Sequence, residues 1–171
     1  IDNFSSIEIV NANDLLEKEL ISYLLYIKIN KYPIYLTRHG ESIYNTKGLI
    51  GGNSSLSKKG KCYIEELYNF FSKNEKWNNL QVFTSTLKRT METGELFLNK
   101  YEVQHYKILD EINAGICDGL TYPEIKEQYP EIHESRKKDK YNYRYPMGES
   151  YKDVVSRLKP FIFEIEQLDK P

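Results

Sequence analysis

A chain of 171 residues, 40% hydrophobic and 29% charged, has the length and composition of a single soluble globular domain. The net charge of −1 argues against a general nucleic-acid binder, and no apolar run is long enough for a membrane-spanning helix. Two cysteines, Cys62 and Cys117, are too few for a disulfide framework and lack metal-site spacing. This cysteine usage favours a reducing cytoplasm.

In chain order, the first predicted element is a helix over residues 13–29, which ends ahead of Pro33. The apolar run at residues 34–38 predicts a buried strand whose carboxyl end delivers Arg38 and His39 to a crevice. Residues 40–56 are rich in glycine, asparagine and serine. An irregular segment of this length inside a compact domain is usually functional.

Strands and helices alternate along the rest of the chain. Buried strands are predicted at residues 80–84 and 103–109. Helices are predicted after Ser57, after Ser85 or Thr86, over Tyr122 to Tyr129 with Pro130 ending it, and from Gly148 to about Leu168. This alternation predicts a three-layer α/β architecture.

Positively charged residues follow two of the predicted strands. Arg38 and His39 come after the first strand, and Arg89 lies in the first turn of the helix after the second. Because the carboxyl ends of strands in an open α/β sheet face one crevice, these side chains are expected to meet there. Arginine, histidine and a helix N-terminus all attract oxyanions, so the crevice is predicted to bind phosphate. Glu111, after the third strand, adds a carboxyl group at the same edge.

Several motifs resemble the signature of the histidine phosphatase superfamily, which includes the phosphoglycerate mutases. They are Thr37-Arg38-His39-Gly40-Glu41-Ser42 with Asn45, Leu49-Ile50-Gly51-Gly52-Asn53-Ser54, Lys88-Arg89-Thr90 and Leu109-Asp110-Glu111-Ile112. The segments from Asp139 to Pro146 and from Gly148 to Tyr151 are similar to the bisphosphatase half of the 6-phosphofructo-2-kinase/fructose-2,6-bisphosphatase family. The resemblance implies a three-layer α/β/α, phosphoglycerate mutase-like fold that is truncated at its C-terminus relative to the family.

The resemblance also implies a role for each site residue. His39 would attack the 2-phosphate of fructose 2,6-bisphosphate to form a phosphohistidine, while a neighbouring acceptor holds the proton of the other ring nitrogen. Glu111 would protonate the leaving sugar oxygen. Arg38, Arg89 and Asn45 would hold the transferring phosphoryl group. The residues that would bind the sugar and its 6-phosphate are Gly51, Tyr122, Arg136, Lys140 and Tyr151. Neither a metal nor a cofactor is implied.

One family feature has no counterpart in these residues. Family members carry a second histidine on a strand that follows the last predicted helix, and neither His105 nor His133 matches that position. Residues 1–32 resemble the end of the kinase domain with its linker, and residues 33–171 resemble an incomplete histidine phosphatase domain. No kinase phosphate-loop motif occurs, so ATP would bind a kinase domain of the full-length protein. We therefore expect little or no turnover from residues 1–171 alone.

Two other functions remain open from the sequence. One is a phosphoglycerate mutase-like or broad-specificity phosphatase, and the other is a non-catalytic module that binds sugar phosphates. The expected ligands are fructose 2,6-bisphosphate, fructose 6-phosphate and phosphate, with no nucleic acid or membrane partner. Tyrosines among the basic residues 136–145 could stack nucleobases, but the near-neutral net charge argues against that function. A homodimer is compatible with the resemblance.

Overall fold

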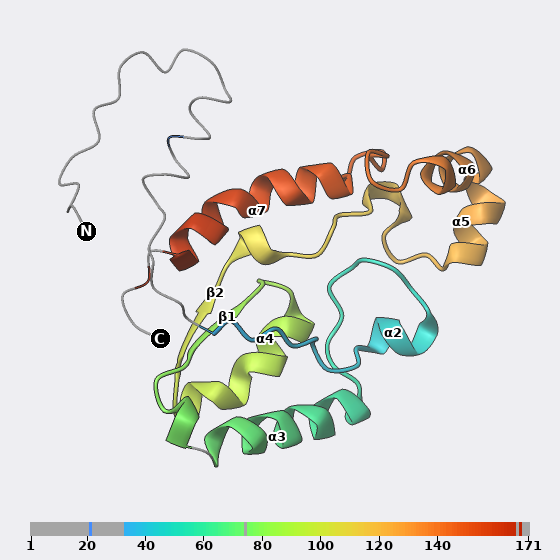
Figure 1. Ribbon diagram of the computed structural model, residues 1–171. Helices are drawn as coiled ribbons and strands as arrows, with labels where there is room; N and C mark the ends of the chain where they lie inside the picture. The colour runs from blue at the N-terminus through green and yellow to red at the C-terminus, as the bar shows by residue number, and fades with distance from the viewer. Residues whose placement is uncertain (1–20, 22–32, 74, 167, 169–171) are drawn as a thin grey trace.

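A computed structural model of the protein describes residues 21, 33–73, 75–166 and 168. The helix predicted over residues 13–29 lies, apart from Ile21, outside the described residues. Figure 1 shows two strands between helices, with α7 on one side of the strands and α3 and α4 on the other. The helices are α2 (Ile43–Lys47), α3 (Lys58–Ser72), α4 (Lys88–Gly94), α5 (Tyr122–Gln128), α6 (Pro130–Lys138) and α7 (Tyr151–Glu166). Short 3-10 helices occupy Glu75–Trp77, Glu95–Asn99, Lys107–Leu109 and Gly115–Cys117.

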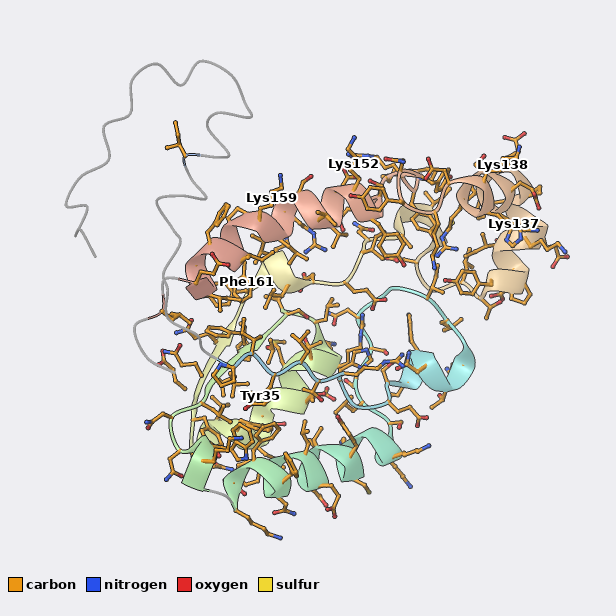
Figure 2. The ribbon with its side chains drawn as sticks, in the orientation of Figure 1. Tyr35, Lys137, Lys138, Lys152, Lys159 and Phe161 are labelled. Atoms are coloured by element: carbon orange, nitrogen blue, oxygen red, sulfur yellow. The ribbon has the colours of Figure 1, made fainter. Side chains whose placement is uncertain are left out.

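The strands β1 (Gln81–Thr84) and β2 (Glu102–His105) pair in parallel. Side chains on β1 alternate between the two helical layers, as the pleat of a strand requires. The Phe83 ring packs edge-on against Phe161 of α7, with ring centroids 5.6 Å apart, and Figure 2 shows Phe161 on α7. The next residue, Thr84, lies against Gly94 of α4 on the opposite side. Helices therefore cover both faces of the strands, and the predicted α/β architecture is confirmed.

Helix α3 forms as the sequence predicts. The side chain of Ser57 caps it by accepting a hydrogen bond from the Gly60 N–H at 3.1 Å. The apolar face of α3 buries Ile64 and brings Phe71 into an aromatic cluster with Trp77 and Phe97. The edge-to-face geometry of such rings adds favourable quadrupolar contacts to the apolar burial. This cluster is the core on the α3 side of the strands.

A second core lies beneath the loops between β2 and α7. It consists of the buried residues Ala114, Cys117, Ile125 and Tyr145. Helix α5 begins at a capping box, in which Thr121 and Glu124 bond each other's backbone N–H groups. Pro130 does not simply end this helix, as predicted, but starts α6 at a position where its missing N–H costs nothing. The first basic residues of the run at 136–145 therefore form the last turn of α6.

The strand predicted at residues 34–38 is wrong. These residues have no assigned strand, and their side chains at Ile34, Tyr35 and Leu36 are exposed. A strand requires a hydrogen-bonded neighbour. Among the described residues β1 pairs with β2, and a cavity of about 410 Å³ separates residues 35–37 from β1. The strand predicted at residues 103–109 is too long. It is found as β2, which ends at His105, and residues 107–109 form a 3-10 helix.

Within the described part of the chain, none of the helices has both the length and the apolar character that crossing a membrane requires.

Candidate active site

Seven of the ten predicted site residues line one cavity. Its volume is about 170 Å³, and it lies between the 42–51 loop, α4, the 111–114 segment and the helices α5 to α7. Arg89 and Glu111 form part of its wall, together with Asn45, Gly51, Tyr122, Arg136 and Tyr151. A larger cavity of about 530 Å³ shares Gly51, Arg89 and Glu111 as lining residues. Residues from distant parts of the sequence thus meet in one cavity, whereas Arg38, His39 and Lys140 do not line it.

Arg89 is the buried cation of this site. Its side chain is 3% exposed, and one Nη atom donates to the Glu111 carboxylate at 2.6 Å. The other Nη atom donates to the carbonyl oxygen of Gly52 at 2.9 Å. Arg89 lies in the first turn of α4, where a cation opposes the helix dipole. The Glu111 carboxylate and the Gly52 carbonyl oxygen offset this unfavourable interaction with the helix dipole.

The N-terminus of α4 is built differently from the prediction that Ser85 or Thr86 caps it. The N-cap residue is Leu87, which has no side-chain cap. Instead, Asn53 reaches across from the 40–56 loop and accepts the Lys88 N–H at 2.7 Å. The hydroxyl of Thr86 donates to Asp110 at 2.9 Å. The start of α4 is therefore tied both to the Gly-rich loop and to the segment that carries Glu111.

Arg136 is held between two tyrosine rings. Its guanidinium carbon lies 5.3 Å from the ring centroid of Tyr122 and 5.8 Å from that of Tyr145. Stacking of this kind fixes a cation without neutralising it. Burial of Tyr145 raises the pKa of its phenol to about 12. Lys140 does not line the cavity, but its ammonium group lies 5.7 Å from the ring of Tyr151, which does.

His39 has the ring geometry of a nucleophile. Its Nδ1 atom lies 2.7 Å from the carbonyl oxygen of Gly40. A carbonyl oxygen only accepts hydrogen bonds, so Nδ1 carries a proton, and the tautomer that this selects has its lone pair on Nε2. The predicted acceptor for the ring proton is therefore the backbone of the next residue.

The backbone beside His39 is fixed to α4. The Gly40 N–H donates to the hydroxyl of Thr93 at 3.0 Å, and that hydroxyl donates to the Arg89 carbonyl oxygen at 2.6 Å. His39 itself lines the 410 Å³ cavity beside β1, and Arg38 is exposed and lines none of the three cavities described above. The structure thus does not bring Arg38 and His39 into the cavity that holds Arg89.

Asn45 and Gly51 shape the loop side of the cavity. The amide oxygen of Asn45 accepts the Ser42 N–H at 3.0 Å, so the amide nitrogen is the part of Asn45 that can donate to a ligand. Gly51 has a φ of +62°, a conformation that glycine adopts without strain, and a side chain there would overlap the carboxylate of Asp118. Partial burial raises the pKa of Asp118, and the nearby Glu111 carboxylate adds to this rise.

Several residues that shape the site were missed by sequence reasoning. Thr93 and Asn53 act on backbone groups, as do Glu149 and Arg157, which line the 530 Å³ cavity. A hydrogen bond to a backbone group leaves no pairing pattern in the sequence, so these contacts were not predicted, although Asn53 and Glu149 lie within the family-like motifs. Tyr145 could have been found, because it lies in the tyrosine-rich run that already pointed to Arg136.

The chain is similar to known proteins over nearly its whole length. The sequence profile of the histidine phosphatase superfamily (branch 1) matches residues 34–171. The chain is 45% identical over 170 residues, 99% of its length, to 6-phosphofructo-2-kinase/fructose-2,6-bisphosphatase of Arabidopsis thaliana. It is 47% identical over 152 residues, 89% of its length, to fructose-2,6-bisphosphatase of Saccharomyces cerevisiae. The chain spans only 23% and 33% of these two relatives.

Solved structures with the same fold support the family match. The alpha-ribazole phosphatase of Shigella flexneri superposes with a TM-score of 0.66 at 21% identity, covering 75% of this chain and 64% of that one. The Bacillus stearothermophilus protein YhfR gives a TM-score of 0.65 at 27% identity, covering 75% and 64%. The sequence profile, the curated relatives and the shared fold agree, and the chain belongs to the histidine phosphatase superfamily, branch 1.

Proposed function

We propose that this chain is the fructose-2,6-bisphosphate 2-phosphatase domain of a bifunctional kinase/phosphatase that regulates glycolysis. The observation that carries the proposal is that Arg89 and Arg136 line the same cavity as Glu111. Two fixed guanidinium groups in one cavity suit a ligand with two phosphates, since arginine binds phosphate oxygens through a planar fork of donors. The names of the relatives at 45% and 47% identity support the same substrate.

In the first step, Nε2 of His39 attacks the phosphorus atom of the 2-phosphate. The N–P bond forms while the bond between phosphorus and the sugar oxygen breaks, and the electron pair of that bond goes to the oxygen. Glu111 gives its proton to this oxygen, so fructose 6-phosphate leaves uncharged at that position. Arg89, Asn45 and Arg38 stabilise the charge on the phosphoryl oxygens.

In the second step, water attacks the phosphohistidine. The Glu111 carboxylate accepts a proton from the water, the N–P bond breaks, and the electron pair returns to Nε2 of His39. Inorganic phosphate is released and both residues regain their starting forms. In the ion pair Arg89 stabilises the Glu111 carboxylate, so the substrate phosphate must first compete for this guanidinium and release Glu111 before it acts as the acid.

The far end of the cavity would bind the sugar and its 6-phosphate. Arg136, fixed between Tyr122 and Tyr145, would donate to the 6-phosphate, and Lys140 would add a second positive charge. Tyr151 and the backbone at Gly51 would contact the sugar. A second cationic group placed for a sugar 6-phosphate favours the bisphosphate over 3-phosphoglycerate, whose second anionic group is a carboxylate on a shorter carbon chain.

We further propose that residues 33–171 form an incomplete phosphatase domain and that residues 1–32 belong to the end of a kinase domain and its linker. A second histidine on a further strand would complete the site around His39, which lines the 410 Å³ cavity beside β1. We also propose that the full-length protein is a homodimer in the cytoplasm. Its kinase domain, and not residues 33–171, would bind ATP.

The test compares fructose 2,6-bisphosphate with 3-phosphoglycerate as substrates, in the full-length protein and in residues 1–171. We expect the full-length protein to release phosphate from the bisphosphate with a kcat/KM at least about a hundredfold higher, since each charged hydrogen bond to the second phosphate contributes about 1.5–3 kcal/mol. Residues 1–171 are expected to show little turnover. Equal use of both substrates would favour a broad-specificity phosphatase, and robust turnover by residues 1–171 would contradict the incomplete-domain proposal.

A second candidate function is a module that binds sugar phosphate without hydrolysing it. It is favoured by one observation, namely that His39 lines a different cavity from Arg89 and Glu111. Thermal stabilisation of the full-length protein by fructose 2,6-bisphosphate without release of phosphate would support this function.

A further inference from the structure

The segment that carries Glu111 has no secondary structure to hold it. Residues 110–114 belong to neither a helix nor a strand, and they follow the short 3-10 helix at Lys107–Leu109. A general acid must be held near its hydrogen-bond distance from the oxygen that it protonates, and displacements of about 1 Å cost roughly a hundredfold in rate. Something outside this segment must therefore fix its backbone.

Arg157 of α7 supplies those contacts. Its two Nη groups donate to the carbonyl oxygens of Ile108 and Asp110, and a longer bond of 3.4 Å reaches the carbonyl oxygen of Glu111. The side chain is 22% exposed, and its Nε atom donates to the Glu149 carboxylate at 2.8 Å. The planar fork of donors on arginine satisfies several acceptors at once, which a single ammonium group does not.

Glu149 extends the same contact to the other side of Glu111. Its carboxylate accepts the Asn113 N–H at 3.0 Å, and its own N–H donates to the Asn113 carbonyl oxygen at 2.8 Å. On the opposite side of the segment, the Asp110 carboxylate accepts the backbone N–H and the hydroxyl of Thr86. The backbone before Glu111 is thereby fixed from α7 and the backbone after it from Glu149, which precedes α7, while the loop before α4 holds Asp110.

We propose that Arg157, oriented by Glu149, is a positioning residue for the general acid Glu111. This inference rests on the proposed function, because it assigns Glu111 the task of protonating the leaving oxygen. Arg157 acts on the backbone that carries Glu111, so its effect is confined to the step in which a proton is transferred. Of the phosphate ligands, Asn45 accepts a hydrogen bond from Ser42, and Arg89 keeps its bond to the Gly52 carbonyl oxygen when Glu111 is displaced.

The choice of leaving group separates this role from general structural support. The sugar oxygen of fructose 2,6-bisphosphate is a strongly basic leaving group and needs a proton, whereas p-nitrophenolate is weakly basic and leaves without one. In single-turnover phosphorylation of His39 in the full-length protein, we expect Arg157→Met to slow transfer from fructose 2,6-bisphosphate about a hundredfold. Transfer from p-nitrophenyl phosphate should fall less than about threefold, and KM should change little.

Two further variants complete the test. In a Glu111→Gln background, Arg157→Met is expected to add less than about a threefold loss, because residues that act through one group are not additive. Arg144→Met removes another arginine–carboxylate pair, the exposed one with Asp153, and should leave both rates unchanged. If Arg157→Met does not fold, Arg157→Lys serves instead, since one ammonium nitrogen cannot replace both donors.

Equal losses on both phosphate donors, or additive losses in the double variant, would overturn the positioning role. Failure of the proposed function gives a different result, in which the wild-type protein transfers phosphate from p-nitrophenyl phosphate but not from fructose 2,6-bisphosphate. The comparison is then repeated with 3-phosphoglycerate, whose leaving oxygen also needs a proton. Arg157→Met should again slow transfer from this substrate much more than transfer from p-nitrophenyl phosphate.

Discussion

Replacement of Arg89 by methionine is expected to lower phosphoryl transfer from fructose 2,6-bisphosphate by about a hundredfold to a thousandfold, the usual effect of removing one fixed donor to a developing oxyanion. The free energy of unfolding should change by less than about 2 kcal/mol. Methionine fills much of the same buried space. The Glu111 carboxylate that loses its partner is 55% exposed and is therefore still solvated. Arg89→Met is therefore expected to lose activity while the stability of the protein changes little.

The matched control is Lys88→Met. Lys88 precedes Arg89 on the same helix, is exposed and lines none of the described cavities, so the variant removes the same charge without touching the site. Its rate of transfer should equal that of the wild type. Single-turnover kinetics and urea unfolding of the full-length proteins provide the two measurements. A large loss of stability with little loss of transfer would show that Arg89 is a structural residue.

Replacement of Gly60 by alanine is expected to destabilise the protein although it improves the helix propensity of α3. Alanine in a helix is favoured over glycine by up to about 1 kcal/mol. At this position, however, the new methyl group would overlap the carbonyl oxygen of Glu41. Overpacking against the backbone costs about 1–3 kcal/mol, so the contact outweighs the propensity.

The same substitution should also reduce activity, because Glu41 is two residues from His39. Gly40 faces Gly60 across this contact, and a side chain at Gly40 would come within 2.8 Å of the Gly60 carbonyl oxygen. The backbone of residues 39–41 would have to move away from α3, which displaces His39, the proposed nucleophile. We expect a melting temperature several degrees lower, since about 1 kcal/mol corresponds to about 2–4 °C for a domain of this size.

Glu65→Ala is the control for Gly60→Ala. Glu65 is an exposed residue of the same helix, so the variant tests helix propensity without the backbone contact. Its melting temperature and its rate of transfer should both stay close to those of the wild type. A Gly60→Ala protein that is more stable than the wild type would show that the backbone of residues 40–41 yields without cost.

The helices that bury an apolar face were predictable from the sequence. The spacing of Ile64, Leu67 and Phe71 is sufficient to place α3, and Ser57 marks its beginning because the cap is a local interaction. The final helix was found in the same way and becomes α7, which continues through Pro160. Local periodicity and capping decide such elements, and both can be read from a short window of sequence.

Features that depend on distant partners were not predictable. Residues 34–38 have the composition of a strand, but no described strand lies beside them to pair with. Helix α6 was missed because its surface is polar and its first residue is the proline that was taken as a stop signal. At the site, Arg89, Glu111 and Arg136 followed from motifs, whereas Arg157 and Thr93 bind backbone groups that look alike in any sequence.

The most direct test of the central claim is to map the phosphorylated residue. The full-length protein is mixed with fructose 2,6-bisphosphate that carries a radiolabel at the 2-phosphate, and the reaction is quenched in alkali, in which phosphohistidine is stable. We predict that the label is found on Nε2 of His39, because the Gly40 carbonyl holds the proton of Nδ1, and that His39→Ala abolishes it. Release of labelled phosphate without a protein-bound label, or a label on His105 or His133, would contradict this account.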